Sequence, residues 1–367
     1  MDDNQQDSPE PIKIKVLLDF LNNNYKSEDK IFKSKVSNGY WSNLSKTDQE
    51  KLFLCLKSMN TKEAIKKYFP QYYSMIYNPI RNAGLTLLDI KKDEVGVDYG
   101  CMWGNMLLYA SKNCREMLGI DQTLDSLKFV QKRIKEENIN NCYLLQADIR
   151  SKLNLQSRFD FSIVNGVLEW VPEVSEVELD IYHSRDKIKL NKGSNDIINL
   201  SPTKLQHKFL CQVNDHLNDR GRLYLAIENK FNYQYFLWKR DPHVNLFYTS
   251  FLPKFISNLI SYIFRGRPYR NYIYSKNGLK KLLKNAGFTS ITSYAAFPSY
   301  QFPLKIIPID HKYLFYEPVY FRGPRKGIFM RVFRKFRRLL DELIFNKLKL
   351  LFFVPAFIII AEKETMK

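Results

Sequence analysis

Five short apolar segments of this chain are each followed by residues with oxygen-bearing side chains or by glycine. In a parallel sheet flanked by helices, ligands bind beyond the carboxyl ends of the strands. If the five segments are strands, these residues therefore gather at one edge of the sheet, where carboxylates can accept hydrogen bonds from a ligand. They are Asp98 with Gly100, Asp121, Asp148, Asn165 with Gly166, and Glu228 with Asn229.

The first three of these ends predict an adenosine-containing cofactor. Gly100 and Gly104 allow a tight turn and a close backbone approach to a ligand. Asp121 lies 23 residues after Asp98, at the tip of the next segment, where an acid can accept hydrogen bonds from both hydroxyls of a ribose. Asp148 follows the third segment and could accept from the exocyclic amine of adenine. As alternatives, Asp121 and Asp148 could be helix N-caps.

The glycine-containing stretch VGVDYGCMWGN, residues 95–105, restricts which cofactor this is. A nicotinamide dinucleotide needs a G-x-G-x-x-G run that brings its pyrophosphate onto a helix N-terminus, and Met102 stands where that run has its middle glycine. The chain also has no phosphate loop ending in GK[ST], which argues against a nucleoside triphosphate. We expect the Met102 side chain to point away from the cofactor or to pack under the N-terminal part, leaving the Gly100 backbone to make the contact.

The elements that must position these residues follow from the hydrophobic pattern. From residue 94, apolar runs alternate with helical segments, which predicts an α/β fold with a parallel sheet covered by helices on both faces. Before that, residues 12–80 have the spacing of short helices, so we expect a helical N-terminal cap, residues 1–85, on a larger domain, residues 86–367. The alternation breaks at 231–272, a lid-like insertion, and at 301–349, a basic insertion, and FVPAFIIIAEK closes the chain as a strand.

Composition limits the compartment and the partners. The net charge is +19 at pH 7, which favours anionic partners such as nucleic acid, a phospholipid surface or phosphorylated substrates, although an AT-rich genome would also enrich lysine.

The five cysteines show no CxxC spacing, so we expect reduced thiols in the cytoplasm and no metal site. The acidic start is not a signal peptide, and the longest apolar run, Leu350–Ala361, is too short to span a bilayer.

The stretch DYGCMWG, with an acid followed by a glycine-rich turn, resembles the first motif of class I S-adenosylmethionine-dependent methyltransferases. The resemblance implies a Rossmann-like fold whose mostly parallel seven-stranded sheet has an antiparallel last strand. It places Asp98 near the methionine end, Asp121 at the ribose, Asp148 at the adenine and Asn165 near the methionine or the substrate. The cofactor contacts that it implies are Asp98, Gly100, Gly104, Asp121, Gln122, Asp148, Ile149 and Asn165.

Longer blocks narrow the resemblance. Stretches such as NGVLEWV, LAIENKFNYQYF and FPSYQFPLKIIPI, spread over residues 77–310, resemble a methyltransferase subgroup found beside glycosyltransferases in bacterial surface-polysaccharide clusters. This implies O-methylation of a glycan or of a lipid-phosphate-linked saccharide precursor.

Methyl transfer to a hydroxyl requires alignment of the acceptor and removal of its proton. The candidate bases are His243 and Glu228, with Glu169 as a further one, and Asp241 could orient His243. Arg81 is a candidate for binding the carboxylate of the cofactor or substrate, since a guanidinium suits that group.

Two alternatives remain open at the level of the sequence. Basic residues mixed with aromatic ones, as in FRGRPYR at 264–270, are compatible with an RNA or nucleoside methyltransferase. The other alternative is a non-catalytic protein that retains the fold and binds a membrane or a partner. The main argument for it is Met102, which replaces the middle glycine of the loop. The basic segment 322–349 could contact the inner face of the membrane, or it could be the solvated face of a helix.

Overall fold

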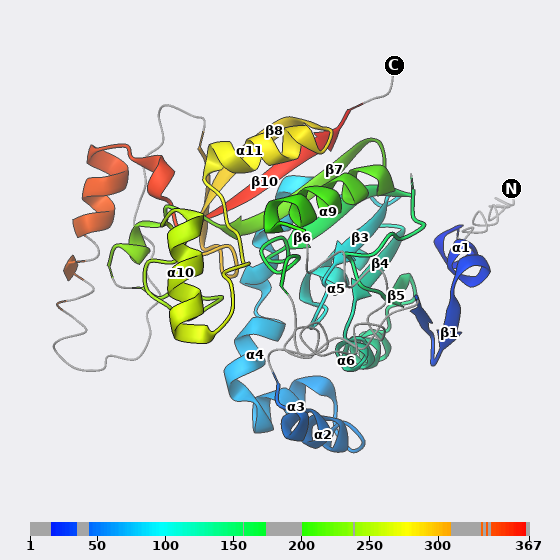
Figure 1. Cartoon of the computed structure of the whole chain (residues 1–367). Coiled ribbons are helices and arrows are strands. Elements are labelled where there is room, and N and C mark those ends of the chain that lie inside the picture. Colours follow the sequence, from blue (N-terminus) through cyan, green and yellow to red (C-terminus); the bar gives the residue numbers. More distant parts are fainter. Residues whose placement is uncertain are drawn as a thin grey trace, which may run out of the picture.

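The computed structural model describes residues 16–34, 44–156, 158–173, 200–237, 239–309, 332, 335–336 and 339–364. They form a central twisted sheet with helices on both of its faces (Figure 1). The strands are β1 (Lys26–Glu28), β2 (Ile31–Lys33), β3 (Val95–Tyr99), β4 (Glu116–Asp121), β5 (Cys142–Gln146), β6 (Phe159–Asn165), β7 (Leu217–Glu228), β8 (Phe288–Phe297), β9 (Lys305–Pro308) and β10 (Ala356–Lys363).

The helices carry the connections between these strands. They are α1 (Val16–Asn24), α2 (Lys46–Cys55), α3 (Thr61–Tyr68), α4 (Pro70–Tyr77), α5 (Asn105–Ser111), α6 (Leu124–Glu136), α9 (Pro202–His216), α10 (Lys254–Arg265) and α11 (Lys276–Asn285), with short helical turns η1 (Pro79–Leu88), η3 (Tyr233–Tyr235), η4 (Glu342–Lys347) and η5 (Leu351–Phe353). No helix of the described residues is both long enough and apolar enough to cross a membrane.

The sheet has the order β1-β2-β5-β4-β3-β6-β7-β10-β8-β9. Its centre confirms the expected seven-stranded sheet: β5, β4, β3, β6 and β7 run parallel, and the last strand, β10, is antiparallel to both β7 and β8. Three short strands extend it, β1 and β2 at one edge and β9 at the other. The predicted closing strand FVPAFIIIAEK is thus β10.

Alternate residues along each strand face different helices, because side chains of a strand point to opposite sides of the sheet. On one face Leu118 and Ile120 of β4 belong to the core beneath α1, α9 and α11. On the other face Met117 belongs to the core beneath η1, α5 and α6. Burial on both faces explains why the central strands read as continuous apolar runs in the sequence.

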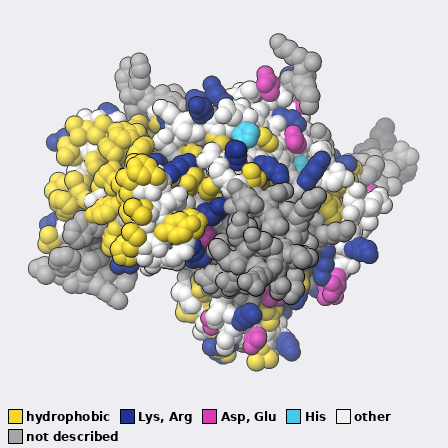
Figure 2. Space-filling view, viewed as in Figure 1, with side chains coloured by type: hydrophobic (Ala, Val, Ile, Leu, Met, Phe, Trp, Pro, Cys, Tyr) yellow, Lys and Arg dark blue, Asp and Glu magenta, His cyan; other side chains and the backbone are white. Residues whose placement is uncertain are grey.

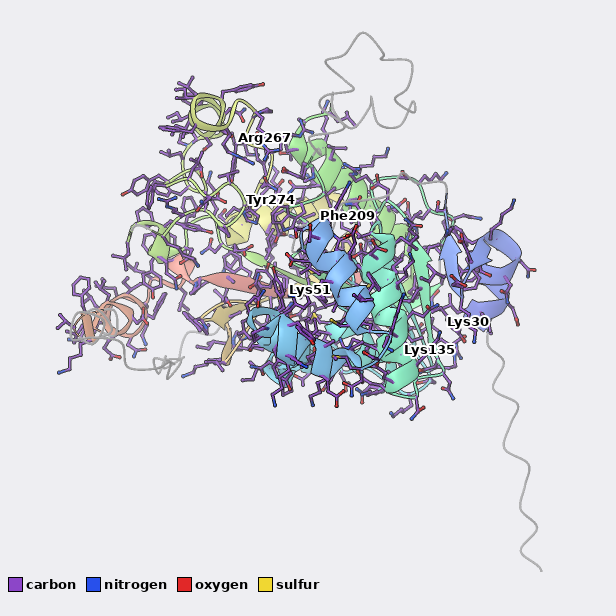
Figure 3. All side chains as sticks on the ribbon, turned by 90° about the horizontal axis from the view of Figure 1, so that it is seen from below. Lys30, Lys51, Lys135, Phe209, Arg267 and Tyr274 are labelled. Carbon is purple, nitrogen blue, oxygen red and sulfur yellow. The ribbon has the colours of Figure 1, made fainter. Side chains whose placement is uncertain are left out.

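The N-terminal region is only partly the helical cap that the sequence predicts. Helices α2, α3 and α4 form a separate cluster with Trp103 and Phe129, as a cap would. Residues 26–33, in contrast, form β1 and β2, and β2 pairs in parallel with β5. In Figure 3, Lys30 between those two strands and Lys51 on α2 mark these two parts of the region.

The reason for this difference is that β5 would otherwise be an open edge with unpaired backbone groups, and pairing with β2 satisfies them. A three-residue strand such as Lys26–Glu28 has too short an alternation to stand out from the helical spacing around it.

Candidate active site

The turn between β3 and α5 uses three left-handed residues. Gly100 has φ 69°, Met102 φ 43° and Gly104, which precedes α5, φ 75°. Space also demands glycine at the two ends: a Cβ on Gly100 would lie 2.8 Å from Cγ2 of Val167, and one on Gly104 would lie 2.9 Å from Cγ1 of Val130. Met102 therefore has the backbone conformation that usually favours glycine, although it carries a long side chain.

The Met102 side chain packs against the cluster formed by α2, α3 and α4. This confirms the expectation that it lies under the N-terminal cap. Its backbone N–H donates to Oδ2 of Asp121 (2.9 Å), and its carbonyl accepts from Oγ of Ser126. The substitution of the middle glycine is thus accommodated, because the side chain is directed into the cap and the backbone is fixed by neighbouring side chains.

The backbone hydrogen bonds of Gly100 narrow the expectation that its backbone contacts the cofactor. The N–H groups of Gly100 and Cys101 both donate to the carbonyl of Ile120, at 2.8 and 3.1 Å. Because these donors are used in joining the turn to β4, the Gly100 N–H does not point to a ligand. A ligand can approach only the Cα or the carbonyl side of this glycine.

Asp98 is the last residue but one of β3, Asp121 is the last residue of the neighbouring parallel strand β4, and both are buried. Burial, together with the charge of Asp121, raises the pKa of Asp98 well above its usual value. Burial raises the pKa of Asp121 too, against the lowering by N–H donors from Thr123 and Met102. Asp121 therefore both fixes the turn and keeps unused lone pairs for the ribose hydroxyls that the sequence assigns to it.

Asp148 has a partner that the sequence did not indicate. Arg150 donates from Nε and Nη2 to its carboxylate, at 2.9 to 3.0 Å and 2.8 Å. No helix follows Asp148, so its alternative role as an N-cap is wrong. The other two predicted contacts differ in exposure: Gln122 is exposed at the end of β4, and Ile149 is partly buried against the core.

Within the described part of the chain, four of the predicted residues carry buried polar atoms that lack a hydrogen-bond partner: Asn165, Arg81, Glu169 and Glu228. In Asn165, at the end of β6, this atom is Oδ1, and in Arg81, in η1, these atoms are Nε and Nη1. Burial lowers the pKa of Arg81. A buried polar group without a partner is costly, and a guanidinium binds carboxylates well. The atoms of Asn165 and Arg81 fit a ligand that carries an amino-acid group.

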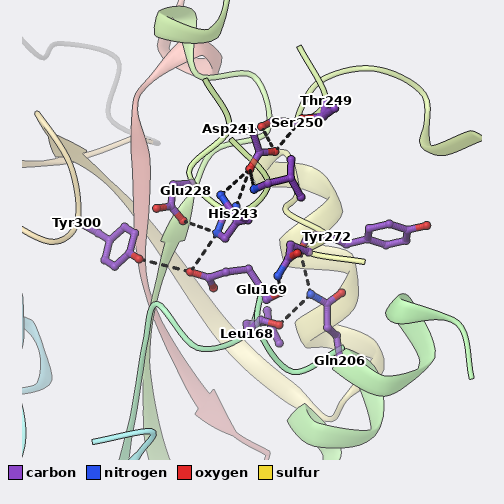
Figure 4. Close-up of polar contacts among 12 residues, drawn as sticks. Leu168, Glu169, Gln206, Glu228, Asp241, His243, Thr249, Ser250, Tyr272 and Tyr300 are labelled. Carbon is purple, nitrogen blue, oxygen red and sulfur yellow. Dashed lines mark hydrogen bonds and ion pairs between the residues drawn. The ribbon is translucent and has the colours of Figure 1, made fainter. Parts of the chain in front are cut away.

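The three residues proposed for catalysis lie together (Figure 4): Glu228 is the last residue of β7, Glu169 follows the end of β6, and His243 lies in the insertion 231–272. Nδ1 of His243 is 3.1 Å from Oδ1 of Asp241, as predicted for an orienting acid. Nε2 of His243 is 3.8 Å from Oε2 of Glu228 and 3.9 Å from Oε1 of Glu169. Tyr300 completes the group, since its hydroxyl donates to Oε1 of Glu169 (3.4 Å).

The charges around His243 and Glu228 decide which of these two candidate bases is better suited to accept a proton. Burial lowers the pKa of His243, but the hydrogen bond with Asp241 and the nearby carboxylates of Glu169 and Glu228 outweigh it and raise the pKa to about 10. Burial and the charge of Glu169, opposed by the charge of His243, raise the pKa of Glu228 to about 7. The raised pKa of His243 favours its imidazolium form at neutral pH, and the raised pKa of Glu228, about 7, suits a general base.

The same three residues could also hold a metal ion. One donor atom from each of Glu169, Glu228 and His243 lies within 4.8 Å of the others. The sequence predicts no metal, on the basis of cysteine spacing, and that reasoning did not consider carboxylates and histidine from separate segments. A proton on His243 and a cation among these three groups exclude each other, because both need the Nε2 lone pair.

The sequence did not single out Tyr300 or Trp170. Tyr300 is buried, and its hydroxyl would lie 2.3 Å from a Cβ on Gly166. The ring of Trp170 meets that of His243 edge to face, with centroids 5.0 Å apart. Both residues are in stretches quoted for the resemblance, NGVLEWV and FPSYQFPLKIIPI, but the chain has too many aromatic residues for their type alone to mark them.

Comparison with known proteins shows a similarity to methyltransferases in part of the chain. Residues 97–183 match the family model described as "Methyltransferase domain". A curated protein of Methanocaldococcus jannaschii, described as "Probable cobalt-precorrin-6B C(15)-methyltransferase (decarboxylating)", is 29% identical over 83 residues. That alignment covers 22% of this chain, and the chain spans less than half, 45%, of that protein.

Solved structures described as SAM-dependent methyltransferases are similar as well. One from Methanosarcina mazei has a TM-score of 0.40 and 14% identity, covering 77% of this chain and 98% of that one. One from Archaeoglobus fulgidus also has a TM-score of 0.40 and 14% identity, covering 81% of this chain and 100% of that one. The fold of this chain follows from its own strand order and not from these low scores.

Proposed function

We infer that this chain, which carries a methyltransferase domain of the class I fold, is an S-adenosylmethionine-dependent methyltransferase. Its cofactor is S-adenosylmethionine. The observation that supports the activity best is the group of Glu228, Glu169 and His243 at the strand ends, on the side where a ligand binds in such sheets.

The residues present fit this cofactor. Asp121 would accept from the ribose hydroxyls, and the unpartnered Nε and Nη1 of Arg81 would donate to the carboxylate of the methionine. Oδ1 of Asn165, also without a partner, would accept from its amino group. When bound, S-adenosylmethionine supplies a methyl carbon on a positively charged sulfur, which an acceptor oxygen can attack.

Arg81 is connected to the acid group through Tyr300. The hydroxyl of Tyr300 donates to Glu169, and Tyr300 lies close enough to Arg81 and Glu228 for their charges to act on its pKa. The residues proposed for the methionine end and for proton removal are therefore neighbours. This arrangement supports a reaction in which Glu228 takes the acceptor proton while the imidazolium of His243 stabilises the carboxylates.

The acceptor that we propose is a hydroxyl of a glycan or of a lipid-phosphate-linked saccharide precursor. The resemblance of the sequence blocks and the net charge of +19 support it, since a positively charged protein attracts phosphorylated acceptors. The corrin-type reaction in the name of the M. jannaschii protein is not transferred, because the alignment omits most of both chains. We place the reaction in the cytoplasm, where the five unpaired cysteines would stay reduced.

The test is transfer of a labelled methyl group to surface-glycan extracts by the wild type and by Glu228→Gln. We expect the variant to lose activity by about 10²- to 10⁴-fold, the usual contribution of a general base, with unchanged affinity for S-adenosylmethionine by calorimetry. The wild-type rate should rise with pH through about 7, because Glu228 accepts a proton only after losing its own.

Glu50→Gln, at an exposed position of α2, is the matched control and should retain full activity. Label appearing only in RNA would replace the glycan acceptor by a nucleic acid. Absence of measurable affinity for S-adenosylmethionine or its demethylated product would overturn the enzyme function itself.

A further inference from the structure

Helix α10 exposes its apolar side chains to solvent. Phe255, Leu259, Tyr262, Ile263 and Phe264 are between 55% and 74% exposed. They follow the spacing of one helix face. In a surface helix of a globular protein that face normally packs on the core, so its orientation here is reversed.

The polar residues of α10 make the inward contacts. Ser257 and Ser261 are buried, and their hydroxyls donate to the carbonyls of Thr249 and Arg267, both at 2.8 Å. Oδ1 of Asn258 accepts from the N–H of Tyr269 (3.0 Å). These bonds hold the polar side of the helix against the segments that precede and follow it, and rotation to bury the apolar side would break all three.

The apolar surface extends beyond this helix. Phe247 and Tyr248, in the segment before α10, are about two-fifths exposed, and Phe236 and Phe352 are nearly half exposed. Figure 2 shows a broad hydrophobic area over α10 and the elements beside it. An exposed apolar patch of this kind marks an interaction site.

The charges around the patch indicate its partner. Lys254 begins α10, Arg265 ends it, and Arg267 follows (Figure 3). Between residues 242 and 309 the chain has nine Lys or Arg and no Asp or Glu. An apolar helix face flanked by cations is typical of helices that lie in the plane of an anionic bilayer.

We propose that α10 docks this protein on an anionic phospholipid surface, with Phe255, Leu259, Ile263 and Phe264 entering the boundary between headgroups and acyl chains. Lys254, Arg265 and Arg267 would then contact lipid phosphates. The alternative occupant, a second copy of the chain, is disfavoured by charge. A two-fold pairing of this face with itself would bring the cations at the helix ends close to those of the partner copy.

The proposal does not depend on the chemistry of the active site, because lipid binding needs neither cofactor nor acceptor. The test of lipid binding is therefore independent of the test of methyl transfer. The proposal also differs from the membrane contact expected from the basic segment 322–349, half of whose residues lie outside the described part of the chain.

The experiment is flotation of the full chain with phosphatidylglycerol vesicles and with phosphatidylcholine vesicles, for the wild type and for the double variant Phe255→Ser and Ile263→Ser. We expect the wild type to bind the anionic vesicles, and to bind them less at high salt. The double variant should bind at least about 10-fold more weakly, because two large apolar side chains no longer enter the lipid. Its thermal unfolding should match the wild type, since both positions are exposed.

Leu54→Ser is the matched control, because Leu54 is 66% exposed but lies on α2; its vesicle binding should equal that of the wild type. Equal binding by the double variant would overturn the proposal, and so would a wild type that binds neither kind of vesicle. A wild-type dimer that the double substitution converts to a monomer, without vesicle binding, would instead assign the face to contacts between copies.

Discussion

Arg81 shows how a single residue can indicate a missing ligand. Its guanidinium is mostly buried, and within the described part of the chain Nε and Nη1 have no hydrogen-bond acceptor. The ring of Phe302, 5.5 Å from the guanidinium carbon, covers one side without neutralising the charge. Because an unpaired buried charge destabilises a fold, its presence is most simply explained by an anion that binds there.

We therefore predict opposite effects of Arg81→Met on stability and on binding. Without ligand, the variant should be as stable as the wild type or more stable, because an unpaired buried charge has been removed. Its affinity for S-adenosylmethionine should fall about 10- to 100-fold, the effect of losing charge-assisted hydrogen bonds. Thermal unfolding and calorimetry measure the two effects. Arg115→Met, at an exposed position, should change neither, and unchanged affinity in Arg81→Met would exclude Arg81 from the cofactor site.

His243 is the second residue whose environment defines its role. Three carboxylates, from Asp241, Glu169 and Glu228, lie around its ring. Since its pKa is about 10 in the folded protein and 6.5 in the unfolded chain, its imidazolium stabilises the fold fully below pH 6.5. That contribution is lost as the pH rises through about 10.

The corresponding prediction concerns the unfolding temperature as a function of pH. In the wild type the unfolding temperature should fall between pH 6.5 and 10, because His243 loses its proton in the unfolded chain while it keeps it in the folded protein. His243→Gln should unfold about 3 °C or more below the wild type at neutral pH. Above neutral pH, its unfolding temperature should depend less on pH than that of the wild type. His207→Gln, on α9, serves as the control and should follow the wild type. Parallel curves for His243→Gln and the wild type would mean that His243 is neutral in the folded protein.

At the scale of elements, the turn between β3 and α5 depends on its backbone conformation more than on side-chain chemistry. Its N–H groups bond to β4, and its two glycines pack against Val167 and Val130. Helix α10 also ends on a left-handed glycine, Gly266 with φ 67°, but no atom lies within 4 Å of the place where its Cβ would be. A comparison of Gly266 with Gly104 therefore separates the cost of a left-handed backbone from the cost of a Cβ that contacts Val130.

Gly266→Ala should lower the free energy of unfolding by about 1–2 kcal/mol, the cost of a left-handed conformation for a residue with a Cβ. Gly104→Ala should cost about 1–3 kcal/mol more, because its Cβ would also press on Val130. Urea denaturation of both variants measures the difference. Equal costs would show that Val130 moves aside freely.

On the scale of the whole molecule, the N-terminal region is part of the sheet domain as well as a cap. Leu17 and Leu21 of α1 belong to the same core as β3, β4 and α9, and the N–H of Leu17 donates to Oε2 of Glu116 on β4 (3.1 Å). Residues 16–34 thus close one edge of the sheet, while α2 to α4 cover the turn at Met102.

We predict that Leu21→Ala lowers the free energy of unfolding by about 2–4 kcal/mol, the usual cost of a cavity in a packed core. Because Leu21 shares a core with the central strands, unfolding should remain one cooperative transition. Leu54→Ala, at an exposed position, should change the free energy of unfolding by less than about 0.5 kcal/mol. A separate low-temperature transition confined to Leu21→Ala would contradict this and make residues 16–34 an independent unit.

The sequence by itself determined the local features of this protein. Strand periodicity, together with the acids at the strand ends, predicted the parallel sheet, and the spacing of Asp98, Gly100, Gly104 and Asp121 predicted the cofactor end. These features depend on residues close together in the chain, or on the rule that parallel strands end at one edge. The antiparallel strand β10 was also predicted from its apolar run and from the resemblance.

Only the tertiary structure decided how residues from distant segments share charge and space. Glu169, Glu228 and His243 come from separate loops and strand ends, and only their proximity makes His243 an imidazolium and raises the pKa of Glu228. The orientation of α10 is of the same kind, because an amphipathic pattern gives a helix two faces and does not say which one is buried. Burial and electrostatics depend on three-dimensional distances, and these are not encoded at any fixed spacing along the chain.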